Sequence, residues 1–114
     1  MQQPDVKKYL LDIIISIDGI KTYTAGITKF ADFTSNRVVY RAVERELEII
    51  AEAITRIKNV DSSIEISQSK KIIGLRNRVI HAYDTVNEDI VWGVVVKHLD
   101  SLKTEVEYLI KKFE

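Results

Sequence analysis

Apolar residues recur at helical spacing near the start of the chain and predict a helix over residues 5–23. The face that they form is made of Val6, Tyr9, Leu10, Ile13, Ile17 and Ile20. Two further apolar residues, Leu11 and Ile15, lie off this face. A helix that is apolar over much of its circumference is normally covered on both sides. We therefore expect this second stripe to pack against another helix of the chain or against a second subunit.

A second long helix is predicted to end at about residue 58, with one apolar face made of Val39, Val43, Leu47, Ile50, Ile54 and Ile57. A short helical turn is expected before it, within residues 27–37. Ser35 or Asn36 is a suitable N-terminal cap, because its side chain can accept a hydrogen bond from a free amide. The connection at residues 59–68 is the most polar in the chain and is predicted to be a loop.

The second half of the chain is expected to hold two more helices, the first at about residues 69–82. Residues 84–89 interrupt the apolar pattern, and Asn87 can cap a long last helix carrying Val91, Val95, Leu99, Leu102, Val106, Leu109 and Phe113. No alternating strand pattern persists in the sequence. Residues 1–114 are therefore predicted to form a single all-α domain, an antiparallel four-helix bundle to which the short turn adds one short extra helix.

Composition and charge exclude several classes of protein. The 114 residues carry 17 Lys and Arg and 17 Asp and Glu, so the molecule lacks the broad positive charge typical of a high-affinity nucleic-acid binder. There is no Cys, which excludes disulfides and thiolate chemistry. The sequence contains neither a secretory signal nor an apolar run of the roughly 20 residues that a membrane span needs, so we expect a cytoplasmic protein without a membrane segment.

Charge is unevenly distributed along the chain. Residues 67–82 contain no acidic residue, and the basic residues among them are Lys70, Lys71, Arg76 and Arg78. Residues 42–52 have the opposite bias, with Arg45 as the one basic residue against Glu44, Glu46, Glu48 and Glu52. The simpler interpretation is two solvated helix faces that attract each other, and the alternative is a functional patch.

Arg76 falls in the middle of the apolar arc of the third predicted helix, among Ile72, Ile73, Leu75, Val79, Ile80 and Tyr83. A guanidinium stays charged in a protein, so in this position it needs a counter-charge or a wet crevice to avoid a desolvation penalty of several kcal/mol. Glu46 is similarly placed on the apolar face of the second long helix. We therefore expect Arg76 and Glu46 to approach each other between the two helices.

Asn77 and His81 are four residues apart and share a helix face, which Gly74 and Arg78 flank. Gly74 leaves room for another molecule to come close. The simpler interpretation of His81 is a partly exposed side chain near a helix end, where the macrodipole favours its charged form. Spacing alone does not decide between a functional site and this structural role.

The segment GLRNRVIHAY, residues 74–83, resembles the signature of the HEPN superfamily, in which Arg is followed by a polar residue, a short spacer and His. The Tyr two residues after the His resembles the HepT-like toxin branch. The segments YLLDIIISI, LEIIAEA and EDIVW follow the same order and spacing, so the resemblance covers nearly the whole chain. Glu46 departs from the pattern, because many relatives have Asn there, and this leaves the lining contributed by the second helix open.

This resemblance implies a homodimer that brings two motif helices together across a cleft and acts as a metal-independent endoribonuclease without a cofactor. Arg76 and His81 would be the catalytic pair, and Asn77 would orient or assist them. The resemblance also implies a type VII-like toxin–antitoxin pair, in which a minimal nucleotidyltransferase, an MntA-like antitoxin, transfers AMP to Tyr83. The residues expected to bind the RNA substrate are Lys70, Lys71 and Arg78.

The chemistry of these residue types agrees with that expectation. Attack by the RNA's own 2′-hydroxyl needs a base and an acid near neutral pH, which His81 and its dimer mate can supply. Arg76 is a permanent planar cation that suits the charge on the phosphate in the transition state. His81 and His98 form no ligand cluster with carboxylates, so no metal site is expected. His98 is interpreted as structural, and Trp92 as a core or interface anchor.

Two other functions remain open from the sequence. A non-catalytic HEPN module would bind a nucleotide or position a substrate for a paired nucleotidyltransferase. A purely structural dimerising bundle would use Arg76 and His81 in local ion pairs. Metal-free cleavage that His81→Ala abolishes would favour the ribonuclease, whereas nucleotide binding without cleavage would favour the module.

Overall fold

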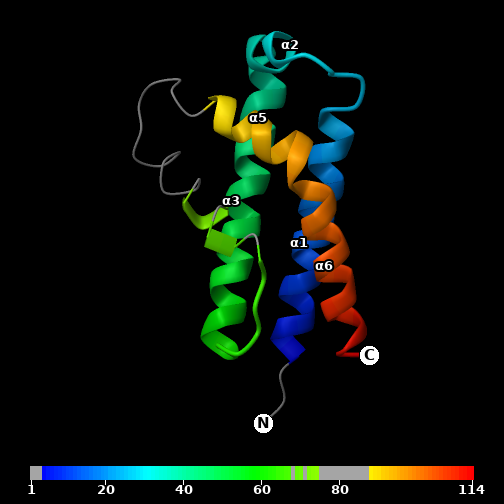
Figure 1. Ribbon diagram of the computed structural model, residues 1–114, viewed down its shortest axis with the longest axis vertical. Helices are drawn as coiled ribbons and strands as arrows, with labels where there is room; N and C mark the ends of the chain where they lie inside the picture. The colour runs from blue at the N-terminus through cyan, green and yellow to red at the C-terminus, as the bar shows by residue number, and fades with distance from the viewer. Residues whose placement is uncertain (1–3, 68, 71, 75–87) are drawn as a thin grey trace.

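The computed structural model describes residues 4–67, 69–70, 72–74 and 88–114. The helices with defined bounds are α1 (Pro4–Tyr23), α2 (Phe30–Ser35), α3 (Arg37–Val60), α5 (Glu88–Lys97) and α6 (Leu99–Lys111) (Figure 1). Residues 69–70 and 72–74 are helical as well, and the described ranges contain no strand. The predicted all-α class is therefore confirmed.

The first helix, α1, packs against both α3 and α6. The chain ascends through α1, crosses at the far end through α2 and descends through α3; α5 then leads into α6, which descends again (Figure 1). Helix α1 is thus antiparallel to both of its long neighbours. The start of α1 and the C-terminal residue lie at the same end of the described structure, where Lys7 and Glu114 form an ion pair at 3.9 Å.

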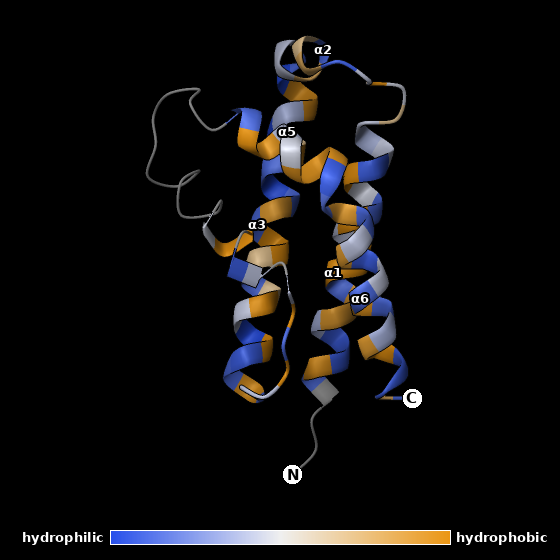
Figure 2. Cartoon of the chain, viewed as in Figure 1, coloured by the Kyte–Doolittle hydropathy of each residue, from blue (hydrophilic) through white to orange (hydrophobic). Residues whose placement is uncertain are grey.

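The predicted apolar faces of the first two long helices are buried in the core. On α1 the fully buried residues are Val6, Leu10, Ile13, Ile17 and Ile20, with Tyr9 partly buried beside them. Of the predicted face on α3, Val43, Ile50, Ile54 and Ile57 are fully buried, with Leu47 nearly buried and Val39 at the edge. Figure 2 shows apolar residues recurring between polar ones along these helices. Each such burial contributes roughly 1.5–3 kcal/mol, which makes this interface the main source of stability among the described helices.

The start of α3 is capped as predicted. The side chain of Asn36 accepts a hydrogen bond from the amide of Val39 at 3.2 Å, and the expected short helical turn before it is α2. At its other end α3 continues to Val60, slightly beyond the predicted end. Asp61 then accepts hydrogen bonds from the hydroxyl and the amide of Ser63 at 2.6 and 3.0 Å, and these bonds lower the pKa of its carboxyl.

The prediction of one long last helix is wrong. The chain forms α5 and α6 instead, and they meet at His98, whose φ is −117°. Backbone hydrogen bonds continue through this junction, from the amide of His98 to the carbonyl of Val94 and from the amide of Leu102 to the carbonyl of His98, both at 3.0 Å. The bend has a packing reason: it lets α5 reach α2 while α6 lies along α1.

The second apolar stripe of α1 remains on the surface of the described structure. Leu11 is 42% exposed and Ile15 is 68% exposed, so no helix of the described ranges covers them. Both partners expected from the sequence, a helix outside the described ranges and a second subunit, stay predictions. None of the described helices is both long enough and apolar enough to cross a bilayer.

Candidate functional site

Most of the predicted site lies outside the described residues. This applies to the predicted catalytic, modified and RNA-binding residues Lys71, Arg76, Asn77, Arg78, His81 and Tyr83. Lys70 is described and is exposed. What the structure describes is therefore the two flanks of the motif segment, which end at Gly74 and begin again at Glu88.

The flank that precedes the motif is fixed to the core by two isoleucines. Ile66 is 3% exposed and Ile72 is 1% exposed, and both belong to the main apolar cluster. Between them Ser69 is nearly buried, and its amide donates a hydrogen bond to the carbonyl of Ile66 at 3.0 Å. At Gly74 no described side chain would touch an added Cβ, which agrees with the expectation that this glycine leaves space.

The same flank is held by a carboxylate from the last helix. Glu105 of α6 accepts hydrogen bonds from the amide of Ser67, with its two oxygens at 3.1 and 2.9 Å. It also accepts one from the Ser67 hydroxyl at 3.0 Å. Sequence reasoning missed this contact, because nothing in the local pattern connects a loop serine with a glutamate on a distant helix.

The flank that follows the motif is anchored by α5. Val91 and Val94 are buried, and the ring of Trp92 lies 4.9 Å from the ring of Phe33 on α2. Phe33 in turn stacks on Tyr40 of α3 at 5.4 Å. The interpretation of Trp92 as a core anchor is therefore confirmed, since it joins α5 to α2 at this aromatic cluster.

Acidic groups lie beside this second flank. Tyr40 is buried, and its burial, together with the nearby charges of Glu44 and Glu88, raises its pKa to about 12. Burial also raises the pKa of Glu44, and the opposing effects of Arg41 and Arg37 are smaller. Glu44, one of the acidic residues within 42–52, thus lies near Glu88, the first described residue after the motif segment.

Glu46 has a partner that the sequence analysis did not identify. The Tyr23 hydroxyl of α1 donates to its carboxylate at 2.9 Å, and this hydrogen bond raises the pKa of Tyr23. A Cβ at Gly19 would come within 3.3 Å of the same carboxylate, so the glycine makes room for it. Because Arg76 lies outside the described residues, its expected pairing with Glu46 stays a prediction.

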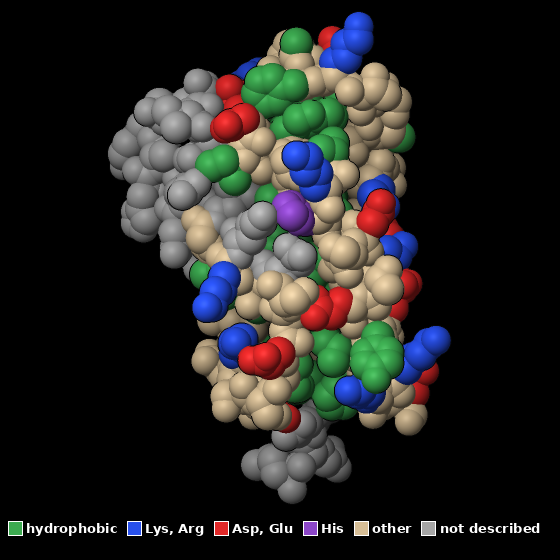
Figure 3. Space-filling view, viewed as in Figure 1, with side chains coloured by type: hydrophobic (Ala, Val, Ile, Leu, Met, Phe, Trp, Pro, Cys, Tyr) green, Lys and Arg blue, Asp and Glu red, His purple; other side chains and the backbone are tan. Residues whose placement is uncertain are grey.

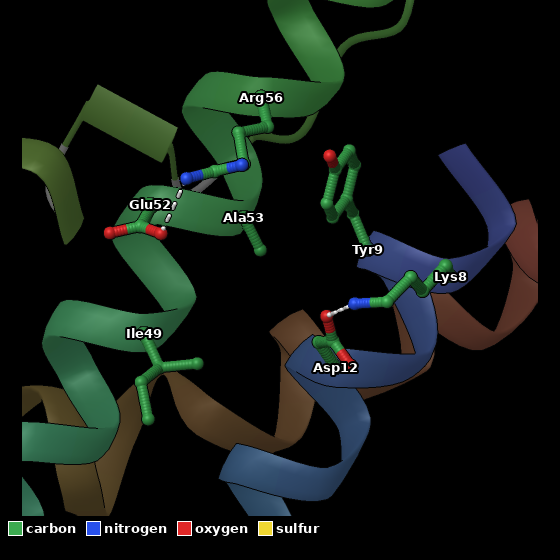
Figure 4. Close-up of a pocket in the computed structure, with 7 residues that line it drawn as sticks. All are labelled: Lys8, Tyr9, Asp12, Ile49, Glu52, Ala53 and Arg56. Carbon is green, nitrogen blue, oxygen red and sulfur yellow. Dashed lines mark hydrogen bonds and ion pairs between the residues drawn. The ribbon is translucent and has the colours of Figure 1, made fainter. Parts of the chain in front are cut away.

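A groove between α1 and α3, with an open volume of about 440 Å³, is lined by Lys8, Tyr9, Asp12, Ile49, Glu52, Ala53 and Arg56 (Figure 4). Lys8 pairs with Asp12 at 2.9 Å, and Arg56 pairs with Glu52 at 3.0 Å. The ring of Tyr9 lies 5.4 Å from the Lys8 ammonium and 5.9 Å from the Arg56 guanidinium. Because each cation is paired with a carboxylate, the groove offers no net positive charge to a phosphate backbone.

The remaining described surface agrees with the balanced composition. Figure 3 shows basic and acidic side chains interspersed on one face. His98 lies at the junction of α5 and α6, and its structural role stays a prediction. In the parts of the chain that the structure describes, no three His, Asp or Glu residues lie close enough together to hold a metal ion.

Comparison with known proteins identifies the family. Residues 13–109 match the HepT-like family, described as Ribonuclease HepT-like. A Thermococcus cleftensis protein named "Probable ribonuclease HepT" is 36% identical over 107 residues, which cover 92% of this chain and 96% of that protein. A Methanocaldococcus jannaschii protein provisionally named an RNase is 31% identical, over 100% of this chain and 94% of its own length. A second protein of that organism with the same kind of name is 34% identical, over 94% of this chain and 98% of its own length. No solved structure matches the chain significantly. The chain, whose motif segment resembles that of the HEPN superfamily, belongs to the HepT-like family.

Proposed function

We propose that this protein is a metal-independent endoribonuclease and that Arg76 and His81 are its catalytic pair. The observation that carries the proposal is that the motif residues lie inside the part of the chain that matches the family. The HepT-like family matches residues 13–109, and within that range the chain has Arg76, Asn77, His81 and Tyr83 at the spacing of the family's motif.

The proposed reaction is attack by a 2′-hydroxyl of the RNA on the adjacent phosphorus. His81 of one protomer accepts the hydroxyl proton as the new P–O bond forms, and His81 of the second protomer donates a proton to the departing 5′-oxygen. The products are a 2′,3′-cyclic phosphate and a free 5′-hydroxyl. Arg76 stabilises the extra negative charge on the phosphoryl oxygens, and Asn77 orients the reacting groups.

The two flanks support this proposal. Ile72 before the motif and Val91 after it are both buried in the core, so the segment between them starts and ends on fixed structure. Catalysis needs groups that are held in position before the substrate arrives. The exposed Lys70 lies on the first flank, and we propose that it binds RNA phosphates together with Lys71 and Arg78.

We further propose that the protein acts as a homodimer and that the exposed stripe of α1 contributes to the interface. Ile15 is 68% exposed, and Leu11 lies beside it on the same helix. Introducing a charge there, as in Ile15→Glu, should convert the dimer to monomer in light scattering. Val38→Glu is the matched control, because Val38 is 80% exposed on another helix and should tolerate the same change. A dimer that survives Ile15→Glu would exclude this face.

The proposal includes regulation by a partner. A minimal nucleotidyltransferase antitoxin would transfer AMP from ATP to the Tyr83 hydroxyl, releasing pyrophosphate. The added phosphate would compete with RNA for Arg76 and Arg78, because it carries negative charge beside them. Incubation with such a partner and ATP should add the mass of AMP to Tyr83 and abolish cleavage, and a Tyr83→Phe variant should escape both effects.

The deciding experiment is cleavage of total RNA in excess EDTA. Wild type should cut, and His81→Ala should not, at equal helicity and dimer content. His98→Ala is the matched control, since it removes the chain's other histidine and should leave cleavage intact. If wild type leaves RNA uncut, and mass spectrometry finds Tyr83 unmodified, the ribonuclease proposal fails. Binding of a nucleotide by that inactive protein would favour the non-catalytic module.

A further inference from the structure

The contact between Glu105 and Ser67 joins two parts of the chain that are far apart in sequence. Both carboxylate oxygens of Glu105 accept from the Ser67 amide, at 3.1 and 2.9 Å. The Ser67 hydroxyl donates to one of these oxygens at 3.0 Å. The side chain of Ser67 is thus engaged by Glu105, along with its backbone.

This contact lies shortly before a helical stretch. Ser67 is two residues before Ser69, the first described residue of the helical residues 69–70 and 72–74. The Ser69 amide donates to the carbonyl of Ile66, whereas the acceptor for the Ser67 amide comes from another helix, α6. The backbone that leads into this stretch is therefore tied to the position of α6.

Helix α6 is itself held firmly in place. Leu102 and Val106 are fully buried, and Lys103 pairs with Asp18 of α1 at 2.8 Å. A second ion pair, between Lys21 of α1 and Asp100 of α6, links the same two helices. The Glu105 carboxylate is therefore presented from a helix that is buried on either side of it, at Leu102 and Val106, and that two preceding residues join to α1 by ion pairs.

We propose that Glu105 is a positioning residue, which holds residues 69–74 in register and thereby sets the place of the motif that follows them. The inference rests on the proposed ribonuclease function for its effect on activity, but the positioning of residues 69–74 stands on the contacts themselves. Glu105 touches neither substrate nor reacting atoms in this proposal. It acts through the backbone of Ser67.

The test compares Glu105→Ala and Glu105→Gln with Glu107→Ala, an exposed glutamate on the same helix that serves as the matched control. Hydrogen exchange of the amides of residues 69–74, the kcat and KM of RNA cleavage, and the melting temperature are measured for each. We expect Glu105→Ala to speed exchange locally and to lower kcat, each by about tenfold, because one charge-assisted hydrogen bond contributes on that order. KM should change by less than about twofold, since ground-state binding is retained. Glu105→Gln should lie between, because its amide oxygen can still accept from Ser67.

Several outcomes would overturn the inference. Unchanged exchange in Glu105→Ala, or equal effects of Glu107→Ala, would show that the contact holds nothing in place. Faster exchange over the whole chain with a proportional loss of folded protein would show a stabilising role without positioning. If the wild-type chain cuts no RNA, the proposed function fails, while local exchange at residues 69–74 still decides whether Glu105 positions them.

Discussion

The loss in free energy of unfolding caused by Ile72→Ala measures how much the burial of Ile72, on the flank before the motif, contributes to stability. The side chain of Ile72 is 1% exposed, whereas the adjacent Ile73, in the same helical stretch, is only partly buried. Ile72→Ala removes three buried carbons, and at about 0.8 kcal/mol each the transfer cost alone is about 2.4 kcal/mol. The cavity left behind adds to this, so we expect the free energy of unfolding to fall by about 3 kcal/mol. Ile73→Ala should cost about 1 kcal/mol, because part of that side chain is already in water.

Urea denaturation followed by circular dichroism measures both losses on the same scale. A domain of this size typically has 5–15 kcal/mol of stability, so the Ile72→Ala variant should still fold at 25 °C. The slope of the free energy against urea should be unchanged, which shows that the folded state keeps its extent of burial. Equal losses for the two variants, or a loss below about 1 kcal/mol for Ile72→Ala, would refute the conclusion that this residue anchors the segment.

Three further predictions concern α3. Asn36→Ala should lower the free energy of unfolding by about 1 kcal/mol in thermal denaturation, because the amide of Val39 loses its cap, and an unchanged midpoint would contradict this. Burial raises the pKa of the Glu44 carboxyl, so its charged form is disfavoured in the folded state. Glu44→Gln should therefore raise the free energy of unfolding at neutral pH. This increase should vanish as the pH falls through the raised pKa. A destabilised Glu44→Gln at neutral pH would show that the contact with Arg41 outweighs burial. The pKa of Tyr40, raised from 10.0 to about 12, means that stability should be lost as the pH rises through this interval, and Tyr40→Phe should remove that loss in alkaline unfolding curves.

The long helices α1 and α3 could be predicted from the sequence because the apolar residues that recur at helical spacing are the same residues that are buried in the core. Residues such as Ile13 and Ile54 recur at helical spacing and are fully buried, and Asn36, one of the two cap candidates with Ser35, caps α3. The break at His98 could not be predicted, because the apolar residues on both of its sides recur at the spacing expected of one continuous helix. The bend accompanies the contact of Trp92 with Phe33 of α2, a residue far away in the sequence.

The sequence predicts the motif residues of the candidate site, but not the contacts that its flanking residues make with distant helices. The motif was identified by its resemblance to the HEPN signature, since its spacing alone leaves a structural role open, and the match to the HepT-like family agrees with that resemblance. The partners of charged groups were not recognised: Glu46 receives a hydrogen bond from Tyr23, and Ser67 is bound by Glu105. Such pairs depend on how helices far apart in sequence lie against each other. Residue type and periodicity describe one helix at a time, so they carry no information on these contacts.

The packing of α1 between α3 and α6 also bears on the order in which the protein is completed during synthesis. The pairing of α1 with α3 uses the first half of the chain and can form early, but the other side of α1 stays uncovered until α6 has been made. Glu105, which binds Ser67, is part of that same last helix. A nascent chain that already contains the whole motif therefore lacks the helix that anchors its first flank. The first flank of the motif can therefore be held by Glu105 only after α6 has been synthesised.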